Sequence, residues 1–302
     1  MLSEKIKNLR KQAKLSQEQL AEKLNVSRQA VTKWETGAGV PDIENLRSIS
    51  SLFQISIDEL IGNETTASPE QDFLFDSVTK YDIDCDKSYD ITFMGAKQVT
   101  LIGYEGEKLE VRLASDQITD LESRFKVKID DVKQKLDIDI HRLDGISETQ
   151  SKAALYVMIR FPLQYTRRIE LAGNTQSLSV ESLDADNVEF SGKTSCVRLH
   201  SATGHIELNS NEDMQIHCEN LSGRLDINQI SATSRLCLPA DIPFLAVKRG
   251  IANSILYEAG GKPAEDFSLK GDAAKTCENV IELNGVKSEL IISTAARVSG
   301  KE

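Results

Sequence analysis

The sequence has no long apolar run. No stretch approaches the about 18 residues that cross a bilayer as a helix, and the amphipathic start, MLSEKIKNLRKQAKL, lacks the apolar segment of a signal peptide. The five cysteines are odd in number and never form a CxxC pair, which is typical of reduced thiols rather than a disulfide framework. These absences predict a soluble, cytoplasmic protein with no membrane partner.

Basic residues are in deficit. Against 47 Asp and Glu there are 36 Lys and Arg, a formal net charge of -11, and a uniformly acidic surface would repel nucleic acid. The deficit is uneven, because residues 1–64 carry nine basic and nine acidic residues, and the first 33 carry eight basic and three acidic. The charge therefore argues against DNA binding only after residue 64. A chain of 302 residues is long enough for two domains.

Apolar residues recur at helical spacing throughout residues 1–62. The helix start signals are Ser16 (with Gln19 as a capping box), Ser27, Asp42 and Ser56, and the stop signals are Gly37 and Gly62. We therefore predict an all-α domain of five helices. Only three residues join the second helix to the third, an arrangement typical of a helix-turn-helix, in which the helix over residues 27–35 enters the major groove.

Residues 9–61 read LRKQAKLSQEQLAEKLNVSRQAVTKWETGAGVPDIENLRSISSLFQISIDELI. Over essentially its whole length this segment resembles the DNA-binding domain of the Xre and phage-repressor family. The resemblance implies a transcriptional regulator, expected to be a repressor, whose partner is double-stranded DNA. A homodimer is expected on a two-fold operator with half-sites about 34 Å apart. We expect no enzymatic activity and no cofactor.

The resemblance assigns contacts that physical chemistry also supports. Arg can form two hydrogen bonds to guanine, and Gln can form two to adenine. The expected base contacts are Arg28, Gln29, Thr32 and Lys33, and the expected phosphate contacts are Gln17, Ser27 and Thr36. The alternative is that these positions are only the solvated face of a surface helix.

Glu35 needs a separate explanation, because a carboxylate facing DNA would repel phosphates. In repressor domains that this segment resembles, the glutamate at this place pairs with an arginine of the first helix, and Arg10 is available here. We therefore expect a structural ion pair between Arg10 and Glu35. Trp34 is expected in the core of the domain.

The spacing of the apolar residues changes after a polar segment. Residues 63–85 are predicted to be a linker, and residues 86–302 an all-β domain, because alternation with period two replaces the helical spacing. Between residues 168 and 239, inward-type pairs recur every 9 to 11 residues. They are Ile169/Leu171, Leu178/Val180, Val188/Phe190, Val197/Leu199, Ile206/Leu208, Ile216/Cys218, Leu225/Ile227 and Leu236/Leu238. The repeat favours a parallel β-solenoid with about 19 residues per turn, or a sandwich of stacked rungs.

The motifs TGHIELN and LSGRLDIN resemble the G-x-I-x-L repeats of bacterial adhesin-type domains whose function is undefined. The domain could serve sensing, assembly or binding of an unknown ligand or protein. Two other functions stay open: an adaptor that binds protein through the helical domain, and a carbohydrate-binding or adhesive β-helix with a regulatory head.

The repeat suggests one further candidate site. With two strands per rung, Arg198, His217 and Cys237 fall in one outward file, with His200 beside Glu219 in the next. Imidazole and thiolate are good zinc ligands. The spacing lacks the close ligand pairs of zinc sites, so we predict no metal.

Overall fold

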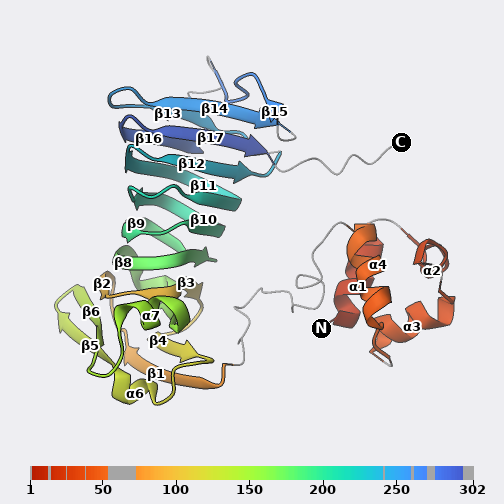
Figure 1. Ribbon diagram of the computed structural model, residues 1–302, viewed down its shortest axis with the longest axis horizontal. Coiled ribbons are helices and arrows are strands. Elements are labelled where there is room, and N and C mark those ends of the chain that lie inside the picture. Colours follow the sequence, from red (N-terminus) through yellow and green to blue (C-terminus); the bar gives the residue numbers. More distant parts are fainter. Residues whose placement is uncertain are drawn as a thin grey trace. The chain divides into compact units, whose positions relative to one another are not determined.

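The computed structural model describes residues 2–12, 15–24, 26–37, 39–53, 73–240, 242–259, 262–270 and 276–294. The chain divides into an N-terminal unit, residues 1–72, and a C-terminal unit, residues 73–302 (Figure 1). Among the helices in these ranges, none combines the length and apolar character that crossing a membrane would require.

The N-terminal unit is helical. Its described helices are α1 (Leu2–Gln12), α2 (Gln17–Leu24), α3 (Arg28–Thr36) and α4 (Ile43–Phe53). One apolar cluster holds them together, formed by Ile6, Leu20, Ala21, Leu24, Val31, Trp34, Leu46 and Ile49. Trp34 is 7% exposed and belongs to this core, as predicted. The predicted fifth helix, from Ser56 to Gly62, lies outside the described residues.

The helix boundaries follow the capping signals of the sequence. Ser16 and Gln19 form a reciprocal capping box, with the Gln19 N–H donating to Ser16 Oγ (3.1 Å) and the Ser16 N–H to Gln19 Oε1 (2.7 Å). Asp42 Oδ1 accepts the Asn45 N–H at 2.8 Å before α4. Gly37 ends α3 in the left-handed region, with φ of 73°, where its N–H donates to the Trp34 carbonyl.

The C-terminal unit is built mainly of strands. They are β1 (Phe75–Asp82), β2 (Lys87–Phe93), β3 (Ala96–Tyr104), β4 (Lys108–Ser115), β5 (Phe125–Val132), β6 (Lys135–Arg142), β7 (Tyr156–Pro162), β8 (Thr166–Glu181), β9 (Asp184–Lys193), β10 (Cys196–Asn209), β11 (Gln215–Ile230), β12 (Thr233–Leu238), β13 (Leu245–Lys248), β14 (Ser254–Ala259), β15 (Lys262–Pro263), β16 (Val280–Val286) and β17 (Glu289–Thr294). Pairs β1–β4, β4–β7 and β5–β6 are antiparallel. From β8 to β12 the paired strands are parallel and stack as rungs (Figure 1).

The parallel strands keep a constant register. Cys196 pairs with Ser177 on one side and Gln215 on the other, each 19 residues away along the chain. The inward pairs predicted between residues 168 and 239 are all buried in one core cluster, which confirms their orientation. The outward residues of successive rungs therefore form straight files along each face.

Single strands of the stack serve two faces. In β10, residues 196–200 pair with β8 and residues 203–209 pair with β9, and the change of partner falls at Ser201, whose φ is 52°. Gly204 and Gly223 are paired neighbours with φ of 103° and 126°, in the region that favours glycine. A Cβ added to Gly223 would lie 2.2 Å from the Gly204 carbonyl oxygen. The glycine of these two G-x-I-x-L repeats is thus required because the backbones of neighbouring rungs approach closely there.

Chain order breaks at the C-terminal rungs. Strands β16 and β17 pair in parallel with β11 and β12 on one side and with β13 and β14 on the other. The rung that comes last in the sequence therefore lies inside the stack, and the rung formed by β13 and β14 lies beyond it (Figure 1).

Two sequence predictions need correction. Strand β1 lies inside the predicted linker, residues 63–85. It pairs with β4, and its exposed residues alternate with half-buried ones such as Phe75 and Tyr81. The all-β prediction also missed two short helices, α6 (Leu121–Arg124) and α7 (Glu148–Ala154). A Ser147 and Gln150 capping box starts α7, a local signal that the period-two alternation of its neighbours concealed.

Candidate nucleic-acid interface

The first turns of α3 present polar side chains to solvent. Ser27 caps the helix, with its Oγ accepting the Ala30 N–H at 3.2 Å. Arg28, Gln29 and Lys33 are exposed, and within the described part of the chain their side chains make no hydrogen bond or ion pair. Their donors and acceptors are therefore available to an external partner.

The threonines of α3 differ from these residues. Thr32 Oγ1 lies 3.0 Å from the Arg28 carbonyl oxygen and 3.3 Å from Gln17 Oε1, so its hydroxyl is engaged within the domain. Thr36 Oγ1 donates to the Thr32 carbonyl at 2.8 Å. Of the predicted base contacts, Thr32 thus offers mainly its methyl group.

The ion pair between Arg10 and Glu35 is present. Arg10 Nε donates to Glu35 Oε1 at 2.5 Å and Nη2 donates to Oε2 at 2.9 Å, a two-point contact from α1 to α3. Their side chains are 12% and 2% exposed, respectively. Burial acts to raise the pKa of Glu35, but the hydrogen bonds from Arg10 and Gln17 outweigh it and lower that pKa. The carboxylate is therefore held in its charged form, turned into the domain.

Gln17 joins this network. Its Nε2 donates to Glu35 Oε2 at 2.8 Å, and Arg10 Nη1 also donates to the Leu15 carbonyl at 2.8 Å. The side chain predicted to hold a phosphate is thus engaged inside the domain. No local pattern in the sequence indicates this bond, because it joins residues 18 positions apart.

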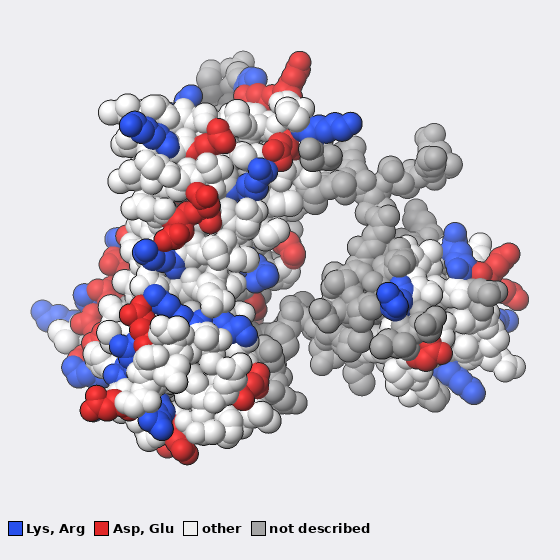
Figure 2. Space-filling view, viewed as in Figure 1, with Lys and Arg blue, Asp and Glu red and all other residues white. Residues whose placement is uncertain are grey.

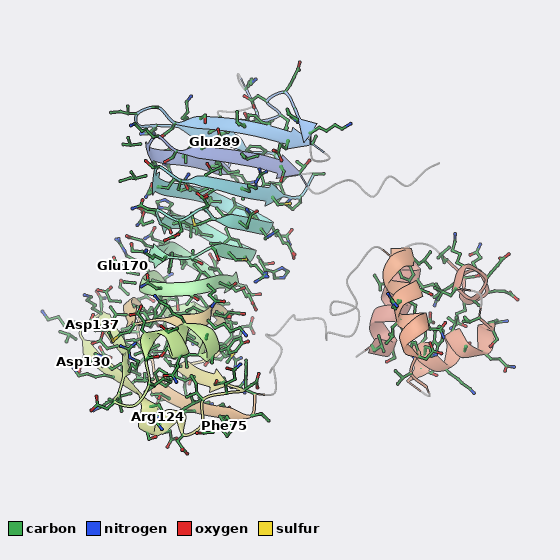
Figure 3. The ribbon with its side chains drawn as sticks, viewed as in Figure 1. Phe75, Arg124, Asp130, Asp137, Glu170 and Glu289 are labelled. Carbon is green, nitrogen blue, oxygen red and sulfur yellow. The ribbon has the colours of Figure 1, made fainter. Side chains whose placement is uncertain are left out.

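A carboxylate column runs along one side of the C-terminal unit, formed by in-register residues of successive strands. Its members are Asp130, Asp137, Asp90, Glu170, Glu189, Glu207, Asp226 and Glu282. Asp130, Asp137 and Glu170 mark it in Figure 3, and Figure 2 shows acidic and basic residues interspersed over the visible face. Lys135, Arg168 and Arg224 each bridge two neighbouring members. This side of the unit is unsuited to a polyanion.

The outward file predicted from the repeat is also formed. Arg198 pairs with His217, and His217 with Cys237, while His200 Nδ1 lies 2.8 Å from Glu219 Oε2. In the described ranges, no three His, Cys, Asp or Glu side chains gather into a group that could hold a metal.

The sequence of the N-terminal unit matches a known family. Residues 6–60 fit the family model described as helix-turn-helix. These residues form a helix-turn-helix domain. The domain is similar to the HTH-type transcriptional activator BcrR of Enterococcus faecalis, with 52% identity over 62 residues, which is 20% of this chain and 30% of that protein. It is also similar to the cryptic phage CTXphi transcriptional repressor RstR of Vibrio cholerae, with 38% identity over 65 residues, covering 22% of this chain and 58% of RstR.

The two similarities extend over 62 and 65 residues, and the chain spans less than two thirds of either relative. The C-terminal unit has a different likeness. A "putative cell adhesion protein" from Clostridium sporogenes superposes on 73% of this chain and 100% of its own, with 12% identity and a TM-score of 0.40. A match this distant carries no functional argument.

Proposed function

We propose that the chain is a sequence-specific, DNA-binding transcriptional regulator. The proposal rests on three exposed side chains on the first turns of α3, within a domain that matches the helix-turn-helix family. They are Arg28, Gln29 and Lys33, which have no partner in the described part of the chain. In a helix-turn-helix the second helix of the motif, here α3, enters the major groove, and long polar side chains on its first turns reach base edges.

Each predicted contact receives a specific role. Arg28, Gln29 and Lys33 bind base edges, and Thr32 places its methyl group against a thymine methyl. Gln17 offers its main-chain N–H at the start of α2, and Ser27 offers its hydroxyl proton, because its Oγ only accepts within the domain. Thr36 exchanges its bond to the Thr32 carbonyl for one to a phosphate oxygen.

One helix-turn-helix domain covers a half-site, so we propose a homodimer on a two-fold operator. The relatives include an activator and a repressor. Repression is the simpler mechanism, because occupancy of a promoter is sufficient, whereas activation also needs a productive contact with the polymerase. The C-terminal unit, which we describe as a parallel β-solenoid, is proposed to serve sensing, assembly or partner binding.

The test is selection of bound duplexes from a random library by the full chain, followed by fluorescence anisotropy on the selected operator. Arg28→Ala is expected to raise the Kd for the operator by about 5- to 150-fold, equivalent to about 1 to 3 kcal/mol, and to relax selection at one base position. Random duplex should bind nearly as before.

Lys23→Ala is the matched control. Lys23 is an exposed cation in the last turn of α2, outside the proposed recognition helix, so its loss changes the net charge equally. Equal losses for both variants on both duplexes would contradict base reading by Arg28. If the library yields no preferred sequence and DNA binding does not weaken as salt is added, the protein-binding adaptor is favoured.

A further inference from the structure

We propose that the Gln17 side chain is a positioning residue, which fixes the orientation of α3 for base reading instead of contacting a phosphate. The inference rests on the proposed DNA-binding function. It starts from an observed difference: among the residues that the structure describes, Arg28, Gln29 and Lys33 have no side-chain partner, whereas Gln17 uses its side-chain oxygen and nitrogen inside the domain.

Gln17 contacts α3 at two successive turns. Its Nε2 donates to Glu35 Oε2 at 2.8 Å, and its Oε1 lies 3.3 Å from the hydroxyl of Thr32, three residues earlier on the same helix face. The single hydroxyl proton of Thr32 is shared between this oxygen and the Arg28 carbonyl, which lies at 3.0 Å. An amide can do both because one end donates and the other accepts. A single side chain of α2 therefore holds two points along α3.

The apolar core holds the inward face of α3, and two polar contacts restrict its rotation more than one does. Arg10 holds α3 only at Glu35, which is seven residues, or about 10 Å of helix, from Arg28. A small rotation about Glu35 would displace Arg28 by a large part of an ångström. Bidentate base recognition depends on placement within about 0.5 Å. The contact at Thr32 lies one turn from Arg28 and opposes this rotation.

Sequence-independent binding does not share this requirement. Phosphate contacts from helix N-termini and cations tolerate small shifts, because they depend mainly on charge. Loss of a positioning residue is therefore expected to reduce affinity for the operator while leaving affinity for random DNA in place. Loss of a phosphate contact would reduce both equally.

The experiment compares Gln17→Ala with the wild-type full chain on the selected operator and on a random duplex, at three salt concentrations. We expect an increase in Kd of about tenfold on the operator, less than about twofold on random DNA, and an unchanged salt slope. Gln19→Ala is the control, since Gln19 lies on the same helix but bonds to Ser16 and not to α3. Equal losses on the two duplexes would overturn the proposal.

A second variant tests the same bond from α3. Thr32→Val removes the hydroxyl and keeps the shape of the side chain. Because both substitutions remove the same contact between Gln17 and Thr32, the double variant should bind the operator no worse than Gln17→Ala alone. Losses that multiply would contradict the positioning role. If the wild-type chain shows no preference for its selected operator, the proposed function itself has failed, which is a distinct result.

Discussion

Arg10 and Glu35 join the first and third helices of the N-terminal unit through two charge-assisted hydrogen bonds, of 2.5 and 2.9 Å, and both side chains are largely buried. Removing one partner of a buried pair leaves the other charge uncompensated. Glu35→Ala is therefore expected to lower the free energy of unfolding by about 3 to 5 kcal/mol. Urea titration followed by fluorescence measures this directly, because Trp34 is the only tryptophan and lies in the same core.

The double variant Arg10→Met/Glu35→Leu is the control for this prediction. It removes both charges and fills a similar volume with apolar atoms, so it should lose less stability than Glu35→Ala. If the double variant is less stable than Glu35→Ala, the prediction is contradicted. The attraction between the two charges would then exceed the cost of leaving Arg10 unpaired.

The same carboxylate predicts a dependence on pH. The pKa of Glu35 is lowered in the folded state, so its contribution is fully present above the unfolded pKa of about 4.3 and is lost as the pH falls through the folded value. The urea midpoint reported by Trp34 should decline below about pH 4.3 in the wild type. Glu35→Gln should show a smaller decline, and identical profiles would rule out this carboxylate as the source.

Gly223→Ala is expected to destabilise the C-terminal unit by about 2 to 4 kcal/mol. The new methyl group would overlap the Gly204 carbonyl, at a φ that alanine adopts only with strain. Thermal unfolding followed by circular dichroism in the β region measures the loss. The neighbouring residue Ser222 is exposed, so Ser222→Ala should change the midpoint of thermal unfolding by less than about two degrees. Equal midpoints for the two variants would refute the packing argument.

Deleting residues 280–302 removes the rung that lies inside the stack. Strands β13 and β14 then lose the parallel partners that the structure gives them, and Leu225, Ile227 and Leu236 lose their cover. Hydrogen exchange should show lost protection in β11 to β14 together. Deleting only residues 295–302 retains β16 and β17 and is the control. Retained protection of β13 and β14 in the longer deletion would contradict this dependence.

Local signals in the sequence predicted much of this arrangement. The capping residues Ser16, Ser27 and Asp42 and the stop at Gly37 set helix boundaries by themselves, because each acts within four positions. Alternation likewise predicted which residues between 168 and 239 face inward, since strand geometry fixes the side of each residue. The Arg10 and Glu35 pair came from a family resemblance, not from the spacing.

Features that depend on distant contacts were missed. The bond from Gln17 to Glu35 needs the packing of α2 against α3, and no residue type reveals it. Strand β1 carries few apolar residues because it is only half buried, so its composition was mistaken for a linker. The insertion of β16 and β17 inside the stack cannot be predicted from alternation, which is the same whatever the order of the rungs.

The out-of-order rung also has a consequence for synthesis. Translation delivers β13 and β14 well before β16 and β17, yet the earlier pair finds its parallel partners only when the later pair has been made. Residues 245–259 therefore lack their parallel partners, and apolar side chains such as Ile255 stay unpacked, until residue 294 has left the ribosome. The end of the stack closes last, and a chain halted before that point would expose an unfinished edge to proteases and chaperones.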